Sequence, residues 1–237
     1  MQTERYINAT VVVNSWLDLA HLIDTYSLER NWVFRGEDRI NDLLRPRAGR
    51  VSGEKDAARK SAHEPADEEK ALRLFKRQAR PYVSHEPKSD LEWLAIAQHH
   101  GMSTRLLDWT ESALAACFFA VMSAGTAGPA RIFSVRDLPE VSDEQERLPF
   151  ALPVVYVYRP PHISPRIPAQ RSVFTIHPSP TEDFSLFPSL QTWQIAETAC
   201  GPIKRVLDAL GVNESSLFPD LDGLARYIGW RYKWAKF

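Results

Sequence analysis

Cysteine is scarce in this chain, which contains only Cys117 and Cys200 and has no CxxC pair. So few cysteines cannot build a disulfide scaffold, and a reducing compartment is expected. Cys117 lies within an apolar run, residues 113–121, so we interpret it as a small buried side chain and not as a nucleophile.

Long apolar runs and a dominant charge are also missing. The longest apolar stretch, residues 113–122, has about half the length that a membrane span needs. The first residues, MQTER, lack the basic and apolar regions of a secretory signal. The formal net charge is −1, so any nucleic-acid contact must come from a local basic patch. We therefore expect a cytoplasmic protein that makes no membrane contact.

The signature motifs of several enzyme classes do not occur. The chain has no P-loop, no glycine fingerprint of a dinucleotide-binding fold and no GxSxG, which argues against a kinase, a dehydrogenase and an α/β-hydrolase. It also lacks HExxH, His-x3-His and zinc-type Cys/His spacing, so no metal site is predicted.

The chain is nevertheless long and apolar enough to bury a large core. It has 237 residues, of which 44% are hydrophobic and 11% aromatic, and we expect one domain over residues 1–237 with a flexible polar insertion at 51–70. Strands are predicted over residues 10–13, 31–35, 130–135, 153–158, 172–177 and 192–195. Helices are predicted over 15–26, 66–80, 89–100, 112–123, 202–210 and from 219 towards the end of the chain. Because the two kinds of element do not strictly alternate, the pattern predicts an α+β fold: a central, mainly antiparallel or mixed sheet with a buried helix and flanking helices.

The first motif with chemical content is WVFRGE, residues 32–37. An arginine at the end of a buried strand needs an anionic partner, because an unpaired buried charge costs several kcal/mol. That partner is either internal, Asp108 or Glu37, or a bound carboxylate or phosphate that Arg35 holds with two parallel hydrogen bonds. Gly36 would let a ligand approach the backbone.

The second motif is QHHGMSTRLLDWT, residues 98–110. His99 and His100 end a predicted helix, whose negative end favours protonated imidazoles and hence anion binding; a structural or surface role is the alternative. Adjacent helical residues point about 100° apart, so the two rings cannot both face one site. Asp108 can form an ion pair with Arg105 or with Arg35. Trp109 offers a flat surface on which a ligand ring can stack.

Two basic stretches have a structural and a functional interpretation. The arginines at 30, 35, 39, 45, 47 and 50 are offset by nearby acidic residues, which favours a mixed surface over a phosphate track. The tail YIGWRYKWAKF, residues 227–237, mixes basic and aromatic side chains. Such a tail stacks on bases or lies at a membrane surface, but docking of a terminal helix on the core is favoured.

Four segments together resemble the FRG-domain family: FRGE, EWLAIAQHHGMSTRLLDWTESALAACFFAV, PAQRSVFTIH and GVNESSLFPDLDGLARYI. They occur in matching order from about Trp32 to Ile228. The chain departs from the family pattern at Glu37, where the family often has Gln, and near Ser172, where it usually has Gly. The resemblance implies a bacterial or phage-associated context.

A more distant similarity connects the order of these residues to ADP-ribosyltransferase-like folds. Such folds begin with an aromatic-Arg-Gly strand whose arginine grips the phosphates of NAD. They continue with a hydroxyl residue and a late acidic or amide residue. Arg35, Thr104 and Gln170 have that order here, with Glu182 and Glu197 as alternative late carboxylates. This similarity is an analogy between folds.

The resulting functional hypothesis is an NAD-using ADP-ribosyltransferase or NAD glycohydrolase that acts as a toxin or in phage defence on a protein or nucleic-acid acceptor. The expected catalytic residues are Arg35, His99, Thr104, Asp108 and Gln170. The expected ligand-binding residues are Phe34, Gly36, Glu37, His100, Arg105 and Trp109. The alternative is a non-catalytic sensor or partner-binding module that holds a nucleotide or another anionic small molecule in the same pocket. A nucleic-acid-processing protein that uses the basic aromatic tail is a third hypothesis.

Overall fold

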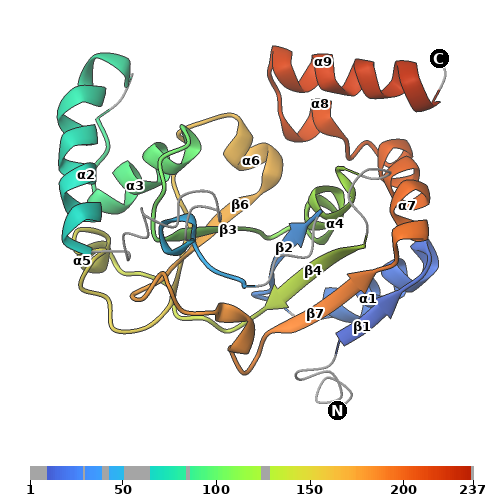
Figure 1. Cartoon of the computed structure of the whole chain (residues 1–237), viewed down its shortest axis with the longest axis horizontal. Coiled ribbons are helices and arrows are strands. Elements are labelled where there is room, and N and C mark those ends of the chain that lie inside the picture. Colours follow the sequence, from blue (N-terminus) through green and yellow to red (C-terminus); the bar gives the residue numbers. More distant parts are fainter. Residues whose placement is uncertain are drawn as a thin grey trace, which may run out of the picture.

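The computed structural model of this chain describes residues 10–28, 30–38, 43–50, 65–83, 86–123 and 129–235. Its centre is a seven-stranded mixed sheet with the strand order β1-β7-β4-β2-β3-β6-β5 (Figure 1). β1 is parallel to β7, and the other neighbouring pairs are antiparallel. The strands are β1 Thr10–Val13, β2 Val33–Glu37, β3 Leu106–Thr110, β4 Ala130–Val135, β5 Tyr156–Tyr158, β6 Ser172–Ile176 and β7 Gln191–Ile195. The predicted α+β class with a mixed sheet is thus confirmed.

Helices flank this sheet. They are α1 Trp16–Ser27, α2 Pro65–Ala79, α3 Asp90–His99, α4 Ala113–Val121, α5 Asp143–Glu146, α6 Arg166–Gln170, α7 Glu197–Ala209, α8 Glu214–Leu217 and α9 Leu221–Trp230. Short 3-10 turns occupy Arg47–Gly49, Arg80–Tyr82 and Phe184–Leu186, and a π-helical turn over Arg231–Ala235 extends α9.

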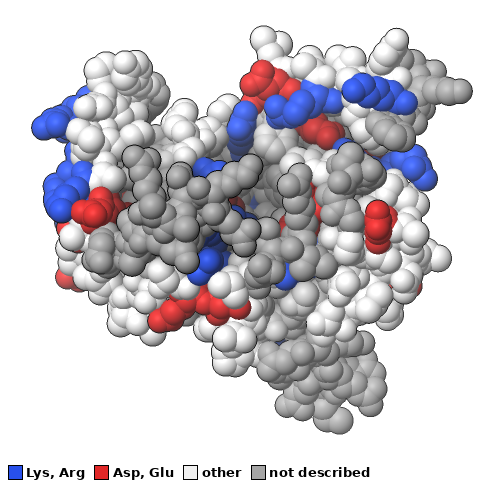
Figure 2. Space-filling view, viewed as in Figure 1, with Lys and Arg blue, Asp and Glu red and all other residues white. Residues whose placement is uncertain are grey.

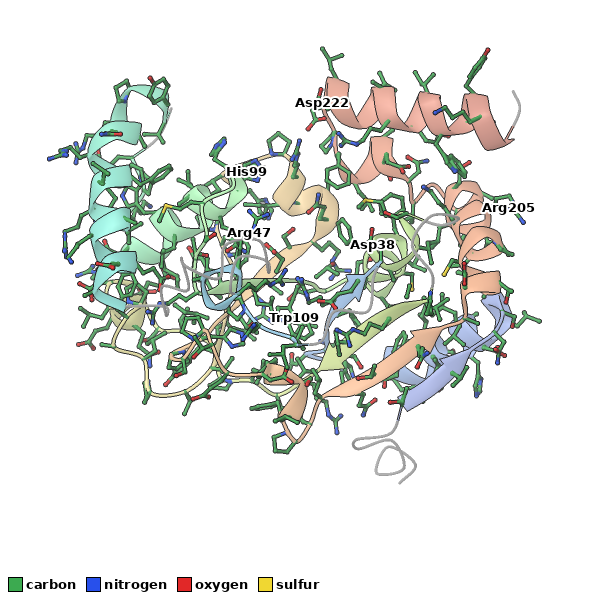
Figure 3. The ribbon with its side chains drawn as sticks, in the orientation of Figure 1. Asp38, Arg47, His99, Trp109, Arg205 and Asp222 are labelled. Atoms are coloured by element: carbon green, nitrogen blue, oxygen red, sulfur yellow. The ribbon has the colours of Figure 1, made fainter. Side chains whose placement is uncertain are left out.

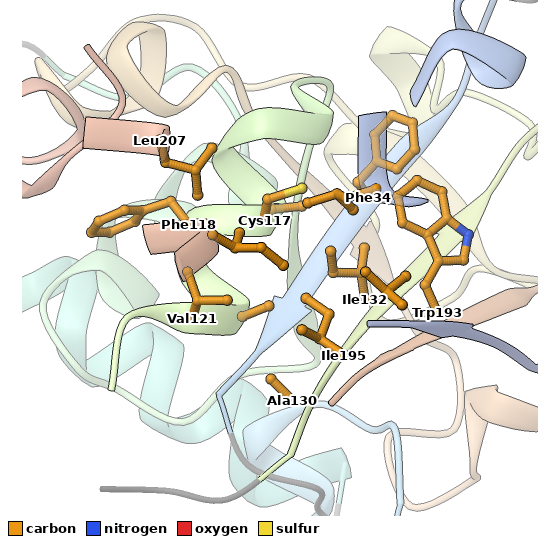
Figure 4. Close-up of a cluster of buried hydrophobic side chains, with 14 of the residues drawn as sticks. Phe34, Cys117, Phe118, Val121, Ala130, Ile132, Trp193, Ile195 and Leu207 are labelled. Atoms are coloured by element: carbon orange, nitrogen blue, oxygen red, sulfur yellow. The ribbon is translucent and has the colours of Figure 1, made fainter. Parts of the chain in front are cut away.

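The most apolar helix, α4, lies buried against the sheet as predicted. Phe34, Ile132 and Trp193 project from one face of the strands into a cluster with side chains of α1, α4 and α7 (Figure 4). Cys117 belongs to this cluster and is fully buried; burial raises the pKa of its thiol far above the ordinary value, so it stays a neutral apolar group. The interpretation of Cys117 as a core residue is therefore confirmed.

A second cluster covers the other half of the same face. α2 and α3 pack over Leu106, Phe174 and Ile176 through a group of buried side chains that includes Leu72, Leu91 and Leu94. Side chains alternate along a strand, and Phe34 is paired with Thr110, so Leu106 and Phe34 face the same way. Two groups of helices therefore stand side by side on one face of the sheet.

Serine and glycine residues mark the ends of several helices. Ser15 and Ser89 cap α1 and α3 by accepting the amides of Asp18 and Glu92. Gly101 and Gly211 have φ of 93° and 82°, the left-handed conformation expected at a helix stop.

Several expectations about single elements were wrong. β2 begins and ends two residues later than the predicted 31–35, so Gly36 lies inside it, and Ser112 is the cap of α4 and not its first residue. Pro202 lies within α7, which begins five residues earlier at Glu197, so it does not mark the first turn. Within the expected insertion at 51–70, residues 51–64 lie outside the described residues, and residues 65–70 begin α2.

Candidate functional site

The geometry of the site begins with two neighbouring strands that separate. β2 and β3 pair only at Phe34 and Thr110. Beyond this pair β2 follows β4 and β3 follows β6, so the two strands diverge. A cleft of about 460 Å³ lies at the divergence, between the two groups of helices. It is seen in Figure 2 as a hollow near the centre of the face, bordered in part by basic side chains.

Basic side chains outnumber acidic ones along this cleft. Its lining contains four arginines and two aspartates: Arg35, Arg47, Arg50, Arg166, Asp38 and Asp108. Figure 3 shows that Arg47, His99, Trp109 and Asp38 gather around the centre, whereas Arg205 and Asp222 lie away from it. Such an excess of positive charge attracts anions and raises their local concentration.

Arg47 and Arg50 come from a segment that the fold holds in place. The amide of Ala48 donates to the carbonyl of Thr104 at 3.2 Å, which ties the segment to the start of β3. Gly49 lies so close to the backbone of Pro180 that a Cβ would fall 1.8 Å from its carbonyl oxygen. The two arginines therefore stand on a segment that is anchored at both β3 and residue 180.

Neither Arg47 nor Arg50 has a carboxylate within 4 Å among the described residues. Arg47 donates to the carbonyl of Gly101 at 3.1 Å and Arg50 to that of Arg45 at 3.1 Å. Burial and the positive charge of Arg35 lower the pKa of Arg50, a sign of crowding among cations. An anionic ligand would relieve this repulsion. The sequence predicted a mixed surface for both arginines, because no local signal distinguishes them from the exposed arginines nearby.

Arg35 bridges the gap between the diverging strands. Its guanidinium donates to the backbone carbonyl of Asp108 at 2.8 Å and to Glu37 at 3.2 Å. Glu37 also accepts from Arg131 at 3.0 Å and is 5% exposed. Glu37 therefore does not line the cleft, contrary to its predicted ligand-binding role, because two arginines hold its carboxylate inside the protein.

A series of side-chain hydrogen bonds holds the carboxylate of Asp108 at the cleft. The Gln98 side-chain amide donates to Asp108 at 2.8 Å, and the hydroxyl of Thr104 donates to the carbonyl oxygen of the same Gln98. The Asp108 side chain is 66% exposed and faces the cleft, whereas Thr104 is fully buried. Thr104 was predicted to contact the ligand directly; its place behind Gln98 makes it a positioning residue instead.

The two histidines at the end of α3 differ in position, as their adjacent places in a helix require. His99 lines the cleft, and His100 does not. The negative end of α3 alone would favour a protonated His99, but partial burial, followed by the charges of His100 and Arg166, lowers its pKa. His99 thus offers a neutral imidazole, able to donate or accept one hydrogen bond at a time.

Arg105 was predicted to bind the ligand, and the structure contradicts this. Its side chain is 1% exposed and forms a pair with Glu68 of α2, at 3.1 Å through Nε and 3.0 Å through Nη2. Its guanidinium also lies 4.4 Å from the ring centre of Phe150. Arg105 lies just before β3, where Glu68 accepts from both its backbone amide and its guanidinium, so its side chain is held against α2 and away from the cleft.

Gln170 lines the cleft but not from a strand. It ends α6, and the residue that follows, Arg171, has a φ of 47°, so the backbone turns between Gln170 and the start of β6. Its amide donates to the carbonyl of Leu217 at 2.9 Å, so it holds α6 against α8. Glu182 and Glu197, the alternative late carboxylates, are not among the cleft-lining residues.

Phe34, Gly36 and Trp109 all border the cleft, although each also has a structural role. Phe34 belongs to the core and Trp109 donates through its indole to Thr175 at 2.8 Å. A Cβ on Gly36 would lie 1.9 Å from the carbonyl oxygen of Ala116, so the missing side chain admits α4 and not a ligand.

An apolar wall, which no sequence motif predicted, also lines the cleft. Phe119 and Met122 supply it from α4 and the residue after it, Ile167 from α6, and Phe218 from the residue after α8. The rings of Phe119 and Phe218 meet edge to face with centroids 6.1 Å apart. The cleft therefore combines cationic and aromatic side chains, and the guanidinium of Arg166 lies 5.3 Å from the ring centre of Phe218.

A buried histidine directly after β6 leads to a prediction about pH. His177 is 3% exposed; burial lowers its pKa to about 3, and the positive charges of Arg35 and Arg105 add to this. Its Nε2 lies 2.8 Å from the hydroxyl of Thr175. A folded pKa below the ordinary 6.5 means that the unfolded chain binds more protons between these two values. The stability contributed by His177 is therefore complete above pH 6.5 and is lost as the pH falls towards 3.

We expect the unfolding free energy of the wild type to fall more steeply with acid than that of His177→Gln. The expected difference in slope approaches about 1.4 kcal/mol per pH unit between pH 6 and 4. Urea unfolding at several pH values measures both slopes. His21→Gln, which changes an exposed histidine of α1, is the control and should follow the wild type. Equal slopes for the wild type and His177→Gln would show that His177 titrates normally.

Neither a metal site nor a membrane span is found in the described part of the chain. No group of three or more His, Cys, Asp or Glu side chains is placed to hold a metal ion there. Within the same ranges, no helix is long and apolar enough to cross a membrane.

Part of the chain matches the model of a known protein family. The model of the FRG domain matches residues 30–127, so this part of the chain is an FRG domain. It contains both sequence motifs, residues 32–37 and 98–110, and the cleft residues Arg35, Arg47, Arg50 and Asp108. Arg166, Gln170 and Phe218 lie outside the match. No curated protein and no solved structure matches the chain.

Proposed function

We propose that this chain, which carries an FRG domain, binds a phosphate-bearing nucleotide in the cleft at the divergence of β2 and β3. The main support for this proposal is that Arg47 and Arg50 line this cleft on an anchored segment. Neither has a carboxylate partner among the described residues. Guanidinium groups form paired hydrogen bonds with phosphate oxygens. The apolar wall around Phe119 and Phe218 favours a ligand that also carries a ring, since an inorganic anion would gain nothing from it.

Within this class NAD is our proposed substrate. Arg47 and Arg50 would hold the pyrophosphate, and the wall of Phe119 and Phe218 would contact a base or the nicotinamide ring. His99 and Gln98 can bond to ribose hydroxyls or to an amide. The cleft volume of about 460 Å³ is within the usual size range of small-molecule sites.

The proposed reaction breaks the bond between C1′ of the ribose and the nicotinamide nitrogen. The bonding electron pair leaves with nicotinamide. The oxygen of water, or an oxygen or nitrogen atom of an acceptor, then bonds to C1′ and loses a proton. The transition state carries positive charge on the ribose, which a carboxylate nearby stabilises. Asp108 is suited to this role because Gln98 and the backbone bond of Arg35 fix its position. An enzyme that consumes NAD in this way would suit a toxin or an anti-phage effector.

One specific observation favours a second candidate, a nucleotide sensor without turnover. None of the late residues Gln170, Glu182 and Glu197 brings a carboxylate to the cleft. Asp38, the other cleft carboxylate, accepts a hydrogen bond from Ser123 at the far end of β2. Catalysis would then depend on Asp108 alone among the proposed charge-stabilising groups.

The test separates binding from turnover. We expect Arg50→Ala to weaken NAD binding about tenfold or more, measured by calorimetry, because a charged hydrogen bond is worth about 1.5–3 kcal/mol. Asp108→Asn should retain binding but release no nicotinamide and transfer no labelled ADP-ribose in lysate. Arg205→Ala, on an exposed arginine of α7 away from the cleft, is the matched control.

Each outcome has a defined meaning. Nicotinamide release that Asp108→Asn abolishes supports the enzyme, and growth arrest of a host that expresses the wild type but not this variant supports a toxin. NAD binding without turnover over hours supports the sensor. Failure of NAD, ATP and ADP-ribose to bind would overturn both candidates.

A further inference from the structure

Helix α9 has apolar side chains on two opposite faces. One face is used within the chain: Gly223 is buried against Phe218, and Tyr227 and Trp230 are half-buried. Lys204 lies 5.1 Å from the ring centre of Trp230, which ties this face to α7. The inner face of α9 is therefore packed against the rest of the chain.

The outer face of α9 forms a stripe of exposed apolar residues. The exposed fractions are 83% for Leu221, 41% for Leu224, 47% for Ile228 and 76% for Tyr232. The spacing of three, four and four residues keeps these side chains on one side of the helix, and Ala225 lies between them. A helix with apolar side chains on both sides normally packs against other protein surface on both sides. An exposed apolar patch bordered by polar residues marks an interaction surface.

The charges beside the stripe indicate what covers it. Asp222 and Lys233 lie on the same flank, near opposite ends of the helix, and both are exposed. Neither has an ionic partner within the described residues. Arg226, between them, is turned back over the ring of Phe218 at 5.1 Å. The flank is therefore negative at one end and positive at the other.

We infer that the outer face of α9 binds the same face of a second copy of this chain in an antiparallel, two-fold arrangement. Residues on one flank of a helix face the same flank of an antiparallel partner, so Asp222 of each copy meets Lys233 of the other. The Leu224 and Ile228 side chains then pack around the two-fold axis. An anionic membrane is a poorer match, because Asp222 at the start of the flank would be repelled by it.

This association is expected to be weak. One pair of short helices buries less than the roughly 1,600 Å² of a standard stable interface, so a dimer that dissociates on dilution is expected. The stripe residues do not line the cleft, and the association is therefore independent of the proposed nucleotide chemistry.

Sedimentation velocity of the whole protein over roughly 1–200 µM tests the inference, a range chosen for an interface below standard size. We expect a concentration-dependent dimer that Ile228→Gln weakens at least tenfold. Asp222→Lys and Lys233→Asp should each weaken it, and the combination of the two should restore it. Leu186→Gln, which changes an apolar residue that is 81% exposed elsewhere, should have no effect.

The double charge reversal at Asp222 and Lys233 keeps this test decisive even if one variant folds poorly. Dimerisation is restored by reversing both charges only if the two residues contact each other directly. A monomer at all concentrations would overturn the inference. So would a dimer that is indifferent to Ile228→Gln and to the charge reversals. Binding to vesicles of anionic lipid that is lost in Ile228→Gln, without self-association, would assign the stripe to a membrane and also overturn it.

Discussion

Replacing Glu68 by alanine is expected to lower the unfolding free energy by about 3–5 kcal/mol, because it leaves the guanidinium of Arg105 buried without a counter-charge. Both side chains are almost completely buried, at 3% and 1% exposure. Glu68 accepts from the backbone amide of Arg105 at 2.8 Å as well as from its side chain. Loss of Glu68 would therefore leave both the backbone amide and the guanidinium of Arg105 without this acceptor. Guanidinium chloride unfolding measures the change.

The paired substitution Glu68→Leu with Arg105→Met distinguishes an ion pair from ordinary packing. Removing both charges removes the desolvation cost together with the attraction, so the double variant should be clearly more stable than Glu68→Ala. Arg73→Ala, which breaks an exposed pair with Glu69 on the same helix, should cost less than about 1 kcal/mol. A Glu68→Ala protein as stable as this control would mean that Arg105 finds solvent or another acceptor.

The same pair shows why part of the site could not be predicted from sequence. Arg105 stands three residues before Asp108, in the motif that suggested a common pocket. Whether its side chain enters the cleft or the α2–α3 layer depends on the first residue of β3 and on Glu68, which is 37 residues away in the chain. Neither the register of β3 nor this distant partner can be derived from local spacing.

Elements specified by local chemistry were predicted well. The capping serines at 15 and 89 and the left-handed glycines at 101 and 211 each act within one turn of the chain. The strand of residues 130–135 and the buried helix after residue 112 followed from composition alone. Predictions of this kind succeed because no distant residue has to be known.

Predictions that required tertiary placement succeeded only in part. Arg35, His99 and Asp108 do meet at one cleft, although about 65 residues separate the two motifs. Arg47, Arg50 and Arg166 could not be distinguished from surface arginines, because the contacts that bring them to the cleft involve residues 104, 180 and 220. Gln170 lines the cleft as expected, but it does so from the end of the five-residue helix α6 and not from a strand.

Gly36 provides the second large expected effect, and it arises from the packing of α4 on β2. A Cβ at this position would lie 1.9 Å from the carbonyl oxygen of Ala116 and 2.6 Å from the amide nitrogen of Ala120. These are backbone atoms of the helix, so no side-chain rotation can relieve the overlap. Gly36→Ala must therefore displace α4 or β2.

We expect Gly36→Ala to lower the unfolding free energy by about 3 kcal/mol or more, at or beyond the upper end of the usual range for overpacked cores. The shift of α4 should also move Phe119 and hence weaken nucleotide binding in the protein that remains folded. Guanidinium chloride unfolding and calorimetry measure the two effects. Gly229→Ala in α9 is the control: apart from its chain neighbours and the backbone of its own helix, its Cβ would meet no atom within 4 Å, so a gain of about 0.5–1 kcal/mol is expected. A Gly36→Ala protein with wild-type stability would show that α4 does not press on β2 at this point.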